Sequence, residues 1–258
     1  MPSGETRKAR RELPPPLPPG ERTVGQLVGE ALRAYGARFW RSLGLGLPVV
    51  VVNAAAWGAS SSSERALVVA PLLATLVPLS YVAACVLVLR PAVGWGRVVV
   101  AYGVAVLVFL PIPLLASFYV LPAVAWFAAT GLSVPAVLVE RLGVRAALVR
   151  GVQLARADFV HALGGLATLA LVVFLTQAGL YFVLREYAEN TQRAAAALAS
   201  LVVSPLVFLG AALLYTDQEA RLRSRGETRK ERDADVPDAH DADREGRPDS
   251  ARQPGPAA

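Results

Sequence analysis

Beyond residue 65, four stretches of this chain contain no Asp, Glu, Lys or Arg, and each is at least as long as a bilayer crossing requires. A helix needs about 20 mainly apolar residues to cross a hydrocarbon core of roughly 30 Å. The four stretches are residues 66–89, 98–139, 159–184 and 194–216. Because each charge-free run is long enough to cross the core as a helix, the sequence predicts an all-α fold, a polytopic membrane helix bundle.

The longest stretch determines the number of crossings. As one helix, residues 98–139 would measure about 63 Å, twice the core thickness, so this stretch must cross twice. A turn at Pro111–Pro113 would leave the first crossing too short. We therefore place the turn near 115–119, with the two prolines kinking or ending the helix before it. With a further apolar run after Arg41, we expect six transmembrane helices, at 42–60, 66–89, 98–116, 119–139, 162–184 and 194–216.

The distribution of Lys and Arg supports six crossings and predicts the orientation. If the N-terminus is cytoplasmic, 23 of the 26 basic residues lie on the cytoplasmic side, and only Arg65, Arg185 and Arg193 lie outside. Cytoplasmic loops are enriched in Lys and Arg in this way. The sequence therefore predicts a multi-pass protein of the bacterial inner (plasma) membrane with both termini in the cytoplasm. The same bias accounts for the net charge of +6 without nucleic acid as a partner.

Both ends of the chain differ in composition from this membrane domain, which we expect to span residues 23–220. Residues 1–22 contain LPPPLPPG and no apolar periodicity, whereas residues 221–258 mix Arg, Asp, Glu, Pro and Gly. Segments of such composition do not bury a core. We expect a disordered Pro-rich N-tail and a disordered charged C-tail.

Two amphipathic segments, 24–41 and 142–161, precede the first and fifth transmembrane helices. The first begins at a predicted capping box formed by Thr23 and Gln26. In both segments apolar residues recur at helical spacing on one face and arginines lie on the other, which is typical of helices in the membrane interface. The segments are 120 residues apart with four crossings between them, so they predict a parallel internal repeat. The predicted apolar face of the second is Val144, Leu148, Val152, Ala155 and Phe159.

Arginines on the polar faces of the two segments are candidates for contact with lipid headgroups. A basic residue near an anionic leaflet contributes about 1 kcal/mol of attraction. We therefore expect membrane lipids, including anionic ones, as partners. The alternative is that these arginines only orient the protein in the membrane. The candidates are Arg33, Arg41, Arg145, Arg150 and Arg156.

Two charged residues interrupt the apolar faces at the same position of the repeat. Arg38 lies among apolar residues of the first segment, and Asp158 lies among those of the second, 120 residues later. Equivalent positions near a pseudo-two-fold axis face each other. We therefore predict an ion pair between Arg38 and Asp158 that joins the two halves. The alternative is that each side chain reaches water independently.

The sequence contains no recognisable pattern of catalytic, metal-binding or cofactor-binding residues. The acidic residues and the histidine near the predicted cytoplasmic surface lack metal-ligand spacing, and there is no Gly-rich phosphate loop. No ionisable residue lies near the middle of a predicted span, where ion-coupled transport would need one. We predict no catalytic residue, metal or cofactor. The residues weighed for chemistry, and expected instead to be solvated charges at helix ends, are Glu140, Asp158, His161, Asp217 and Glu219.

Three segments carry a resemblance to known proteins: VGEALRAYGARFWRSLG, VPAVLVERLGVRAALVRGVQLARADFVHALG and FLGAALLYTDQEARLR. They are similar to a broad bacterial family of six-span proteins, often labelled glycerophosphoryl diester phosphodiesterase membrane-domain-like. The resemblance covers roughly residues 24–223. In that family the membrane domain is sometimes joined to a soluble phosphodiesterase, which we do not expect here, so the resemblance does not imply enzyme activity.

The leading hypothesis is a non-enzymatic bacterial inner-membrane protein that acts as a scaffold or accessory factor. It would handle lipids or partner membrane proteins, and the partner is either another membrane protein or a second copy of the chain. The alternative is a small permease for a neutral or amphiphilic solute. A membrane phosphodiesterase ranks third.

Overall fold

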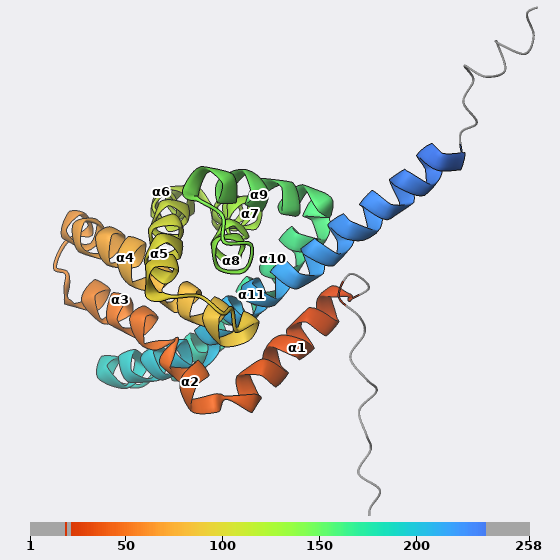
Figure 1. Cartoon of the computed structure of the whole chain (residues 1–258). Helices are drawn as coiled ribbons and strands as arrows, with labels where there is room; N and C mark the ends of the chain where they lie inside the picture. Colours follow the sequence, from red (N-terminus) through yellow and green to blue (C-terminus); the bar gives the residue numbers. More distant parts are fainter. Residues whose placement is uncertain (1–18, 20–21, 236–258) are drawn as a thin grey trace, which may run out of the picture. The chain divides into compact units, whose positions relative to one another are not determined.

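The computed structural model describes residue 19 and residues 22–235, with side chains to residue 228. Within these residues the chain forms eleven α-helices and no strand (Figure 1). The helices are α1 (Val24–Ala37), α2 (Phe39–Gly44), α3 (Leu47–Gly58), α4 (Ser62–Leu89), α5 (Trp95–Phe109), α6 (Ile112–Phe118), α7 (Val120–Thr130), α8 (Ser133–Val139), α9 (Val144–Ala157), α10 (Phe159–Leu184) and α11 (Glu189–Asp235).

Six segments of the described chain are long and apolar enough to cross a membrane, which makes this an all-α, multi-pass membrane protein. They are Phe39–Gly58, Ser62–Leu89, Trp95–Phe118, Val120–Val139, Phe159–Leu184 and Glu189–Thr228. Each overlaps one of the six predicted spans. The third and fourth are separated at Tyr119, whose extended backbone (φ −158°, ψ 153°) ends α6 within the predicted 115–119 range.

Three of the six spans are interrupted, so each consists of two helices. The breaks lie at residues 45–46 between α2 and α3, at 110–111 between α5 and α6, and at 131–132 between α7 and α8. Pro111 lacks a backbone N–H, which explains the second break. At the third break the hydroxyl of Tyr81 donates to the carbonyl oxygen of Gly131 at 3.1 Å. A backbone group freed by the break is thereby satisfied inside the protein, as the membrane requires.

The core of the bundle lies around α8. Every residue from Ser133 to Leu138 is buried, and α8 packs against α4, α5 and α9. Beside it, the rings of Tyr81, Phe109 and Phe127 contact one another with centroids 5.2–6.1 Å apart. Large apolar side chains elsewhere are exposed, as expected where a helix faces lipid rather than a protein core.

The two helices predicted to lie in the interface, α1 and α9, match closely in extent. Both are 14 residues long with bounds 120 residues apart, and both end at a bend, Arg38 (φ −140°, ψ 47°) and Asp158 (φ −155°, ψ 80°). The predicted capping box at Thr23 is present. The two amphipathic helices were predicted to end at residues 41 and 161, but they end before the bends, because α2 begins at Phe39 and α10 begins at Phe159. The two helices differ in their surroundings, since α1 packs on α10 whereas α9 packs on α5, α7, α8 and α10. The internal repeat therefore stays a prediction.

The face of α9 that packs in the bundle shares Ala155 with the predicted apolar face, but its other buried residues are different ones. Val144 and Phe159 are 43% and 38% exposed, whereas Gly151 and Leu154 are buried. A Cβ atom at Gly151 would lie 2.6 Å from the backbone nitrogen of Ser133, so the small residues of α9 allow a close approach to α8. The larger apolar residues Val144 and Phe159 stay exposed, as expected of an apolar face that lies against a membrane interface.

The C-terminal segment is helical further than expected. The chain divides after Arg221 into two compact units, the second of which begins at Leu222. Its described residues continue α11 to Asp235, so the prediction of disorder from residue 221 is wrong for residues 221–235. Arg223 and Glu227 are four positions apart, a spacing that supports an exposed helix. The predicted N-tail, residues 1–22, lies outside the described residues except for residues 19 and 22, and so does the remainder of the predicted C-tail, residues 236–258.

Candidate functional site

Residues 215–221 of α11 hold several parts of the chain together at the end of the last span. Three side chains here carry polar groups and are nevertheless buried: those of Tyr215, Asp217 and Gln218. A fourth, that of Arg221, is partly buried. Buried polar groups are stable only when they are hydrogen-bonded. We call Tyr215, Asp217, Gln218 and Arg221 the α11 polar cluster.

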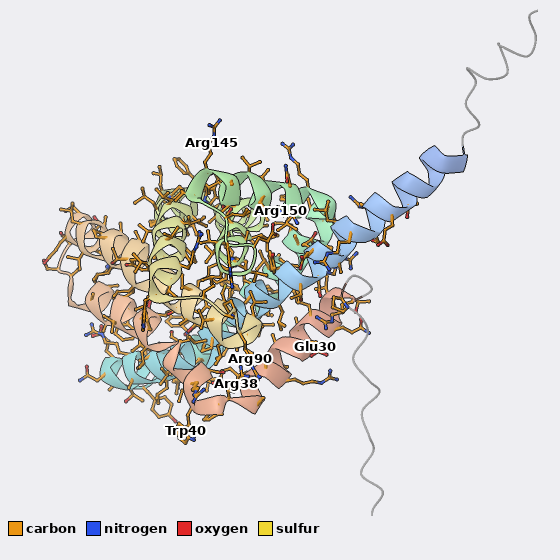
Figure 2. The ribbon with its side chains drawn as sticks, in the orientation of Figure 1. Glu30, Arg38, Trp40, Arg90, Arg145 and Arg150 are labelled. Carbon is orange, nitrogen blue, oxygen red and sulfur yellow. The ribbon has the colours of Figure 1, made fainter. Side chains whose placement is uncertain are left out.

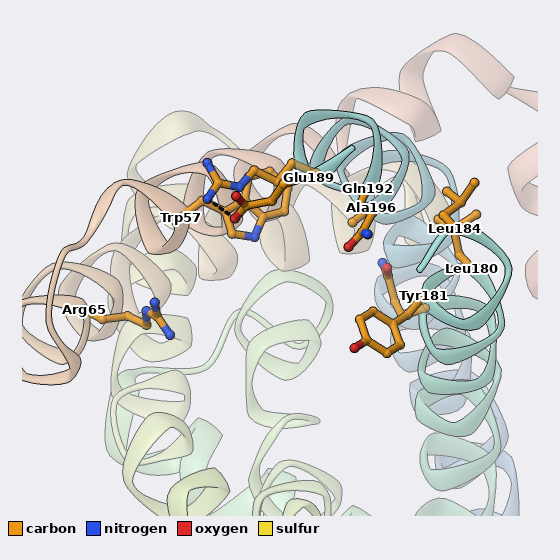
Figure 3. A pocket seen from close by; sticks show the side chains of 10 residues that line it. Trp57, Arg65, Leu180, Tyr181, Leu184, Glu189, Gln192 and Ala196 are labelled. Carbon is orange, nitrogen blue, oxygen red and sulfur yellow. Dashed lines mark hydrogen bonds and ion pairs between the residues drawn. The ribbon is translucent and has the colours of Figure 1, made fainter. Parts of the chain in front are cut away.

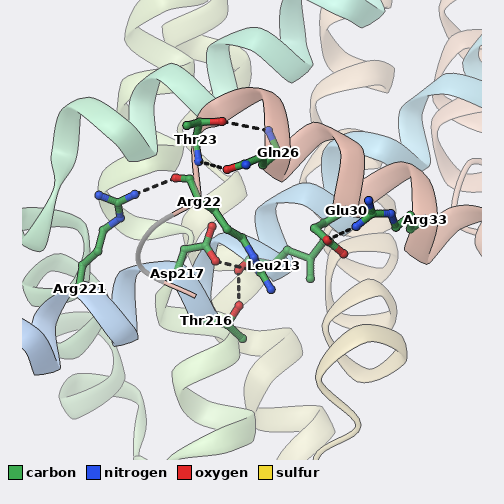
Figure 4. Close-up of polar contacts among 9 residues, drawn as sticks. All are labelled: Arg22, Thr23, Gln26, Glu30, Arg33, Leu213, Thr216, Asp217 and Arg221. Atoms are coloured by element: carbon green, nitrogen blue, oxygen red, sulfur yellow. Dashed lines mark hydrogen bonds and ion pairs between the residues drawn. The ribbon is translucent and has the colours of Figure 1, made fainter. Parts of the chain in front are cut away.

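Asp217 of this cluster pairs with Arg22, which precedes α1. Arg22 Nη1 lies 3.0 Å from Asp217 Oδ1, and the two side chains are 12% and 0% exposed (Figure 4). Arg221 Nη2 also donates to the backbone oxygen of Arg22 at 2.9 Å. The second carboxylate oxygen, Asp217 Oδ2, is buried and has no hydrogen-bond partner among the described residues. The start of α1 is therefore fixed to α11 by a buried ion pair that leaves one oxygen unsatisfied.

Gln218 and Arg221 together hold the bend between α9 and α10. Gln218 accepts a hydrogen bond from the backbone N–H of Asp158 and donates one to its carbonyl oxygen, both at 3.1 Å. Arg221 Nη1 lies 2.9 Å from Asp158 Oδ2. The other oxygen of Asp158 accepts from the backbone N–H of His161 at 3.1 Å, which caps the N-terminus of α10.

Tyr215 extends the cluster to the loop between α8 and α9. Its hydroxyl donates to Glu140 Oε1 at 2.9 Å. Arg150 of α9 donates from Nε to both oxygens of Glu140, each at 2.9 Å. Glu140 is thus fully engaged by two partners from α9 and α11.

The predicted ion pair between Arg38 and Asp158 is not formed, so this prediction is wrong. Arg38 instead donates to the carbonyl oxygen of Leu87, in the last turn of α4, and Asp158 pairs with Arg221. The last four carbonyl groups of a helix lack partners within it, and a guanidinium satisfies one, just as a carboxylate satisfies the N–H groups at a helix start. Each residue stabilises the end of a different helix.

The five arginines predicted to meet lipid headgroups fall into two groups. Arg33 pairs with Glu30, and Arg150 pairs with Glu140. The other three are exposed and make no hydrogen bond or ion pair with any described residue. They are Arg41, Arg145 and Arg156.

Arg145 and Arg150 border a shallow hollow on the surface of α9. Its volume is about 660 Å³, and Arg145 extends from the helix while Arg150 lies against Glu140 (Figure 2). The ion pair leaves the hollow with one uncompensated positive charge, that of Arg145. A guanidinium in this position is suited to hold a phosphate or carboxylate group. The remaining lining residues are Leu142, Ala146, Val149 and Gln153.

Three of the four carboxylates weighed for chemistry are engaged in structural contacts rather than solvated, contrary to expectation. Glu140, Asp158 and Asp217 each accept from an arginine. In the described part of the chain, no group of three His, Cys, Asp or Glu residues is arranged to hold a metal ion. The sequence analysis did not identify Asp217 and Gln218 as contact residues, although the charged segment DQEAR directly follows the charge-free run 194–216.

Comparison with known proteins finds no matching family model, no matching curated protein and no matching solved structure.

Proposed function

We propose that this chain is a non-enzymatic accessory protein of a bacterial inner membrane that binds anionic lipids through its cytoplasmic face. The observation that carries the proposal is the unpaired guanidinium of Arg145 at the hollow on α9, where Arg150 is already neutralised by Glu140. The exposed Arg41 and Arg156 add two further unpaired positive charges to the same face of the expected topology. The resemblance to glycerophosphoryl diester phosphodiesterase membrane domains is consistent with lipid handling without hydrolysis.

Three unpaired arginines suffice for a measurable lipid preference. Each contributes about 1 kcal/mol near an anionic leaflet, which corresponds to about fivefold in affinity. Arg33 and Arg150 contribute less, because their charges are compensated by Glu30 and Glu140 within the protein. Paired and unpaired arginines are therefore expected to differ in lipid affinity, although the sequence alone does not distinguish them.

The test compares single substitutions in the purified full-length chain. Phosphatidylglycerol retained through purification is counted against phosphatidylcholine for Arg145→Gln and Arg156→Gln. Arg185→Gln is the control, because Arg185 is exposed and lies on the opposite side in the expected topology. We expect the first two variants to lose lipid preference and the control to keep it. Equal retention in all three would leave orientation as the only role of these arginines.

The interrupted spans favour a second candidate, a small permease for a neutral or amphiphilic solute. Transporters often bind substrate where transmembrane helices are discontinuous, and three of the six spans here depart from regular α-helix at two residues, which keep right-handed helical backbone angles. Uptake of labelled solutes into liposomes containing the purified chain distinguishes this function from lipid binding alone. Release of headgroup phosphate in the same liposomes would instead favour the phosphodiesterase.

A further inference from the structure

A second cavity lies at the opposite ends of the spans from α1 and α9. Its volume is about 310 Å³, at the lower end of the range for small-molecule sites. It is formed where α3 ends, α4 begins, α10 ends and α11 begins (Figure 3). We call it the outer cavity, after its side in the expected topology. The lining residues used below are Trp57, Arg65, Gln177, Tyr181, Glu189 and Arg193.

The outer cavity contains one positive charge that no carboxylate compensates. Arg193 pairs with Glu189, four residues earlier on α11. Arg65 donates from Nε to the carbonyl oxygen of Ala56 at 3.2 Å, which holds the base of its guanidinium. The two terminal amino groups of Arg65 bond to no described residue. A guanidinium with both terminal groups available suits the paired oxygens of a phosphate.

The inner part of the cavity is polar and leads to a buried hydrogen-bond network. Gln177 Nε2 donates to Ser200 Oγ at 2.8 Å, and Asn53 Nδ2 donates to the same oxygen at 3.0 Å. Ser200 is 3% exposed, so three helices meet at one buried hydroxyl. This network fixes the carboxamide of Gln177, whose oxygen makes no hydrogen bond to a described residue. That oxygen is suited to accept a hydrogen bond from a ligand hydroxyl.

Aromatic rings and apolar side chains surround the polar groups. Trp57 and Tyr181 line the cavity, and Arg65 and Tyr181 lie on opposite sides of it in Figure 3. Trp and Tyr favour the depth at which headgroups meet hydrocarbon. Next to the cavity, Tyr181, Phe182 and Leu198 are more than 60% exposed on α10 and α11. A ligand with a polar head and an apolar tail therefore finds a partner surface for each part.

We propose that the outer cavity binds the phosphate-bearing, hydroxylated head of a single-tailed amphiphile, with Arg65 on the phosphate and Gln177 on the hydroxyl. The tail lies along the exposed apolar surface of α10. The site is independent of the function proposed above, because it uses none of the arginines on the α9 side. A free phosphate ion shares the chemistry of the head but lacks the tail, so the test includes it as a separate probe.

Binding is measured by calorimetry on the full-length chain in detergent, with oleoyl lysophosphatidate as the probe. Monooleoylglycerol has the same tail and glycerol hydroxyls without the phosphate, and inorganic phosphate has no tail. We expect saturable binding of lysophosphatidate, at least about tenfold weaker binding of monooleoylglycerol, and no competition by millimolar phosphate. Equal binding of the two lipids overturns the proposal. If inorganic phosphate fully displaces lysophosphatidate, the site binds the free ion, and the proposed binding of the tail along α10 is overturned.

Variants then locate the binding. Arg65→Gln should weaken lysophosphatidate binding at least about fivefold, Arg65→Lys should recover part of the loss, and Arg185→Gln should have no effect. Because Arg65 is exposed, its substitution leaves the packed bundle intact, and an unchanged melting temperature verifies this. Gln177→Leu should weaken the binding of lysophosphatidate but not that of dodecyl phosphate, a further probe that has a phosphate and a tail but no glycerol hydroxyl. Unchanged affinity in Arg65→Gln would place the phosphate elsewhere and overturn the assignment.

Discussion

Removing Arg22 should destabilise the protein far more than removing an exposed arginine of the same region. The Arg22→Met variant leaves the charge of Asp217 stranded, because the Asp217 side chain is 0% exposed and its second oxygen already lacks a partner. Breaking a buried pair from one side costs about 3–5 kcal/mol. For a chain of this size that corresponds to a melting temperature lower by about 6–20 °C. Asp217→Asn should cost less, about 1–3 kcal/mol, because the 12% exposed Arg22 can reach water.

The measurement is thermal unfolding in detergent of Arg22→Met, Asp217→Asn and the double variant. In the double variant no charge remains buried, so its loss should be smaller than the sum of the two single losses. Arg33→Met is the matched control, since Arg33 lies on α1 and pairs with Glu30 at the surface, where such pairs are worth only about 0.3–0.5 kcal/mol. If Arg22→Met melts no lower than Arg33→Met, or if the two losses simply add, then water reaches Asp217 and the buried-pair argument is refuted.

Two further outcomes follow from the packing of the bundle. Gly151→Ala should lower the melting temperature by about 2–12 °C, because its methyl group would overlap the backbone of α8 at an overpacking cost of about 1–3 kcal/mol. Gly29→Ala on α1 is the control: Gly29 has open space around it, so this variant should be slightly more stable. Equal melting temperatures of the two variants would contradict the close approach of α9 to α8. Arg38→Gln and Asp158→Asn should destabilise additively, since they hold the ends of different helices, and a coupling above about 0.5 kcal/mol would restore a direct interaction between them.

The positions of the spans could be predicted from the sequence because the membrane imposes a one-dimensional constraint. A charge-free run either reaches the length of the hydrocarbon core or does not. The turn at Tyr119 followed from the same argument, since 98–139 is too long for one crossing. Local signals also sufficed at the start of α1, where Thr23 and Gln26 form the capping box within four residues. Each of these features depends on residues that are near one another in the chain.

The contacts of Arg38 and Asp158 could not be predicted in the same way. Their partners, Leu87 and Arg221, are 49 and 63 positions away and belong to α4 and α11. Equivalence in a repeat places two residues at similar points of two helices, but does not make them neighbours. The sign of each charge was the better indicator, because a carboxylate suits the start of a helix and a guanidinium suits the end of one.

The burial of Asp217 was hidden for a related reason. A carboxylate just after an apolar run ordinarily marks the point where a helix leaves the membrane. Here the helix continues, and the charge is covered by Arg22, 195 positions earlier in the chain. The burial pattern of α9 was equally hidden, since large apolar residues of a membrane protein are satisfied by lipid as well as by a core.

The contacts of the α11 polar cluster also determine which arginines remain available to the membrane. A guanidinium held 2.9–3.0 Å from a carboxylate presents little net charge outward, and this is the state of Arg22, Arg150 and Arg221. The arginines around α1, α9 and the end of α11 therefore fall into two classes. Some connect α1, α9 and α10 to α11 through carboxylates, and the exposed remainder, such as Arg145, keep an uncompensated charge, which is the charge that the proposed lipid binding uses. Substitutions that neutralise the first class should lower stability with little change in lipid preference, and those in the second class should do the reverse.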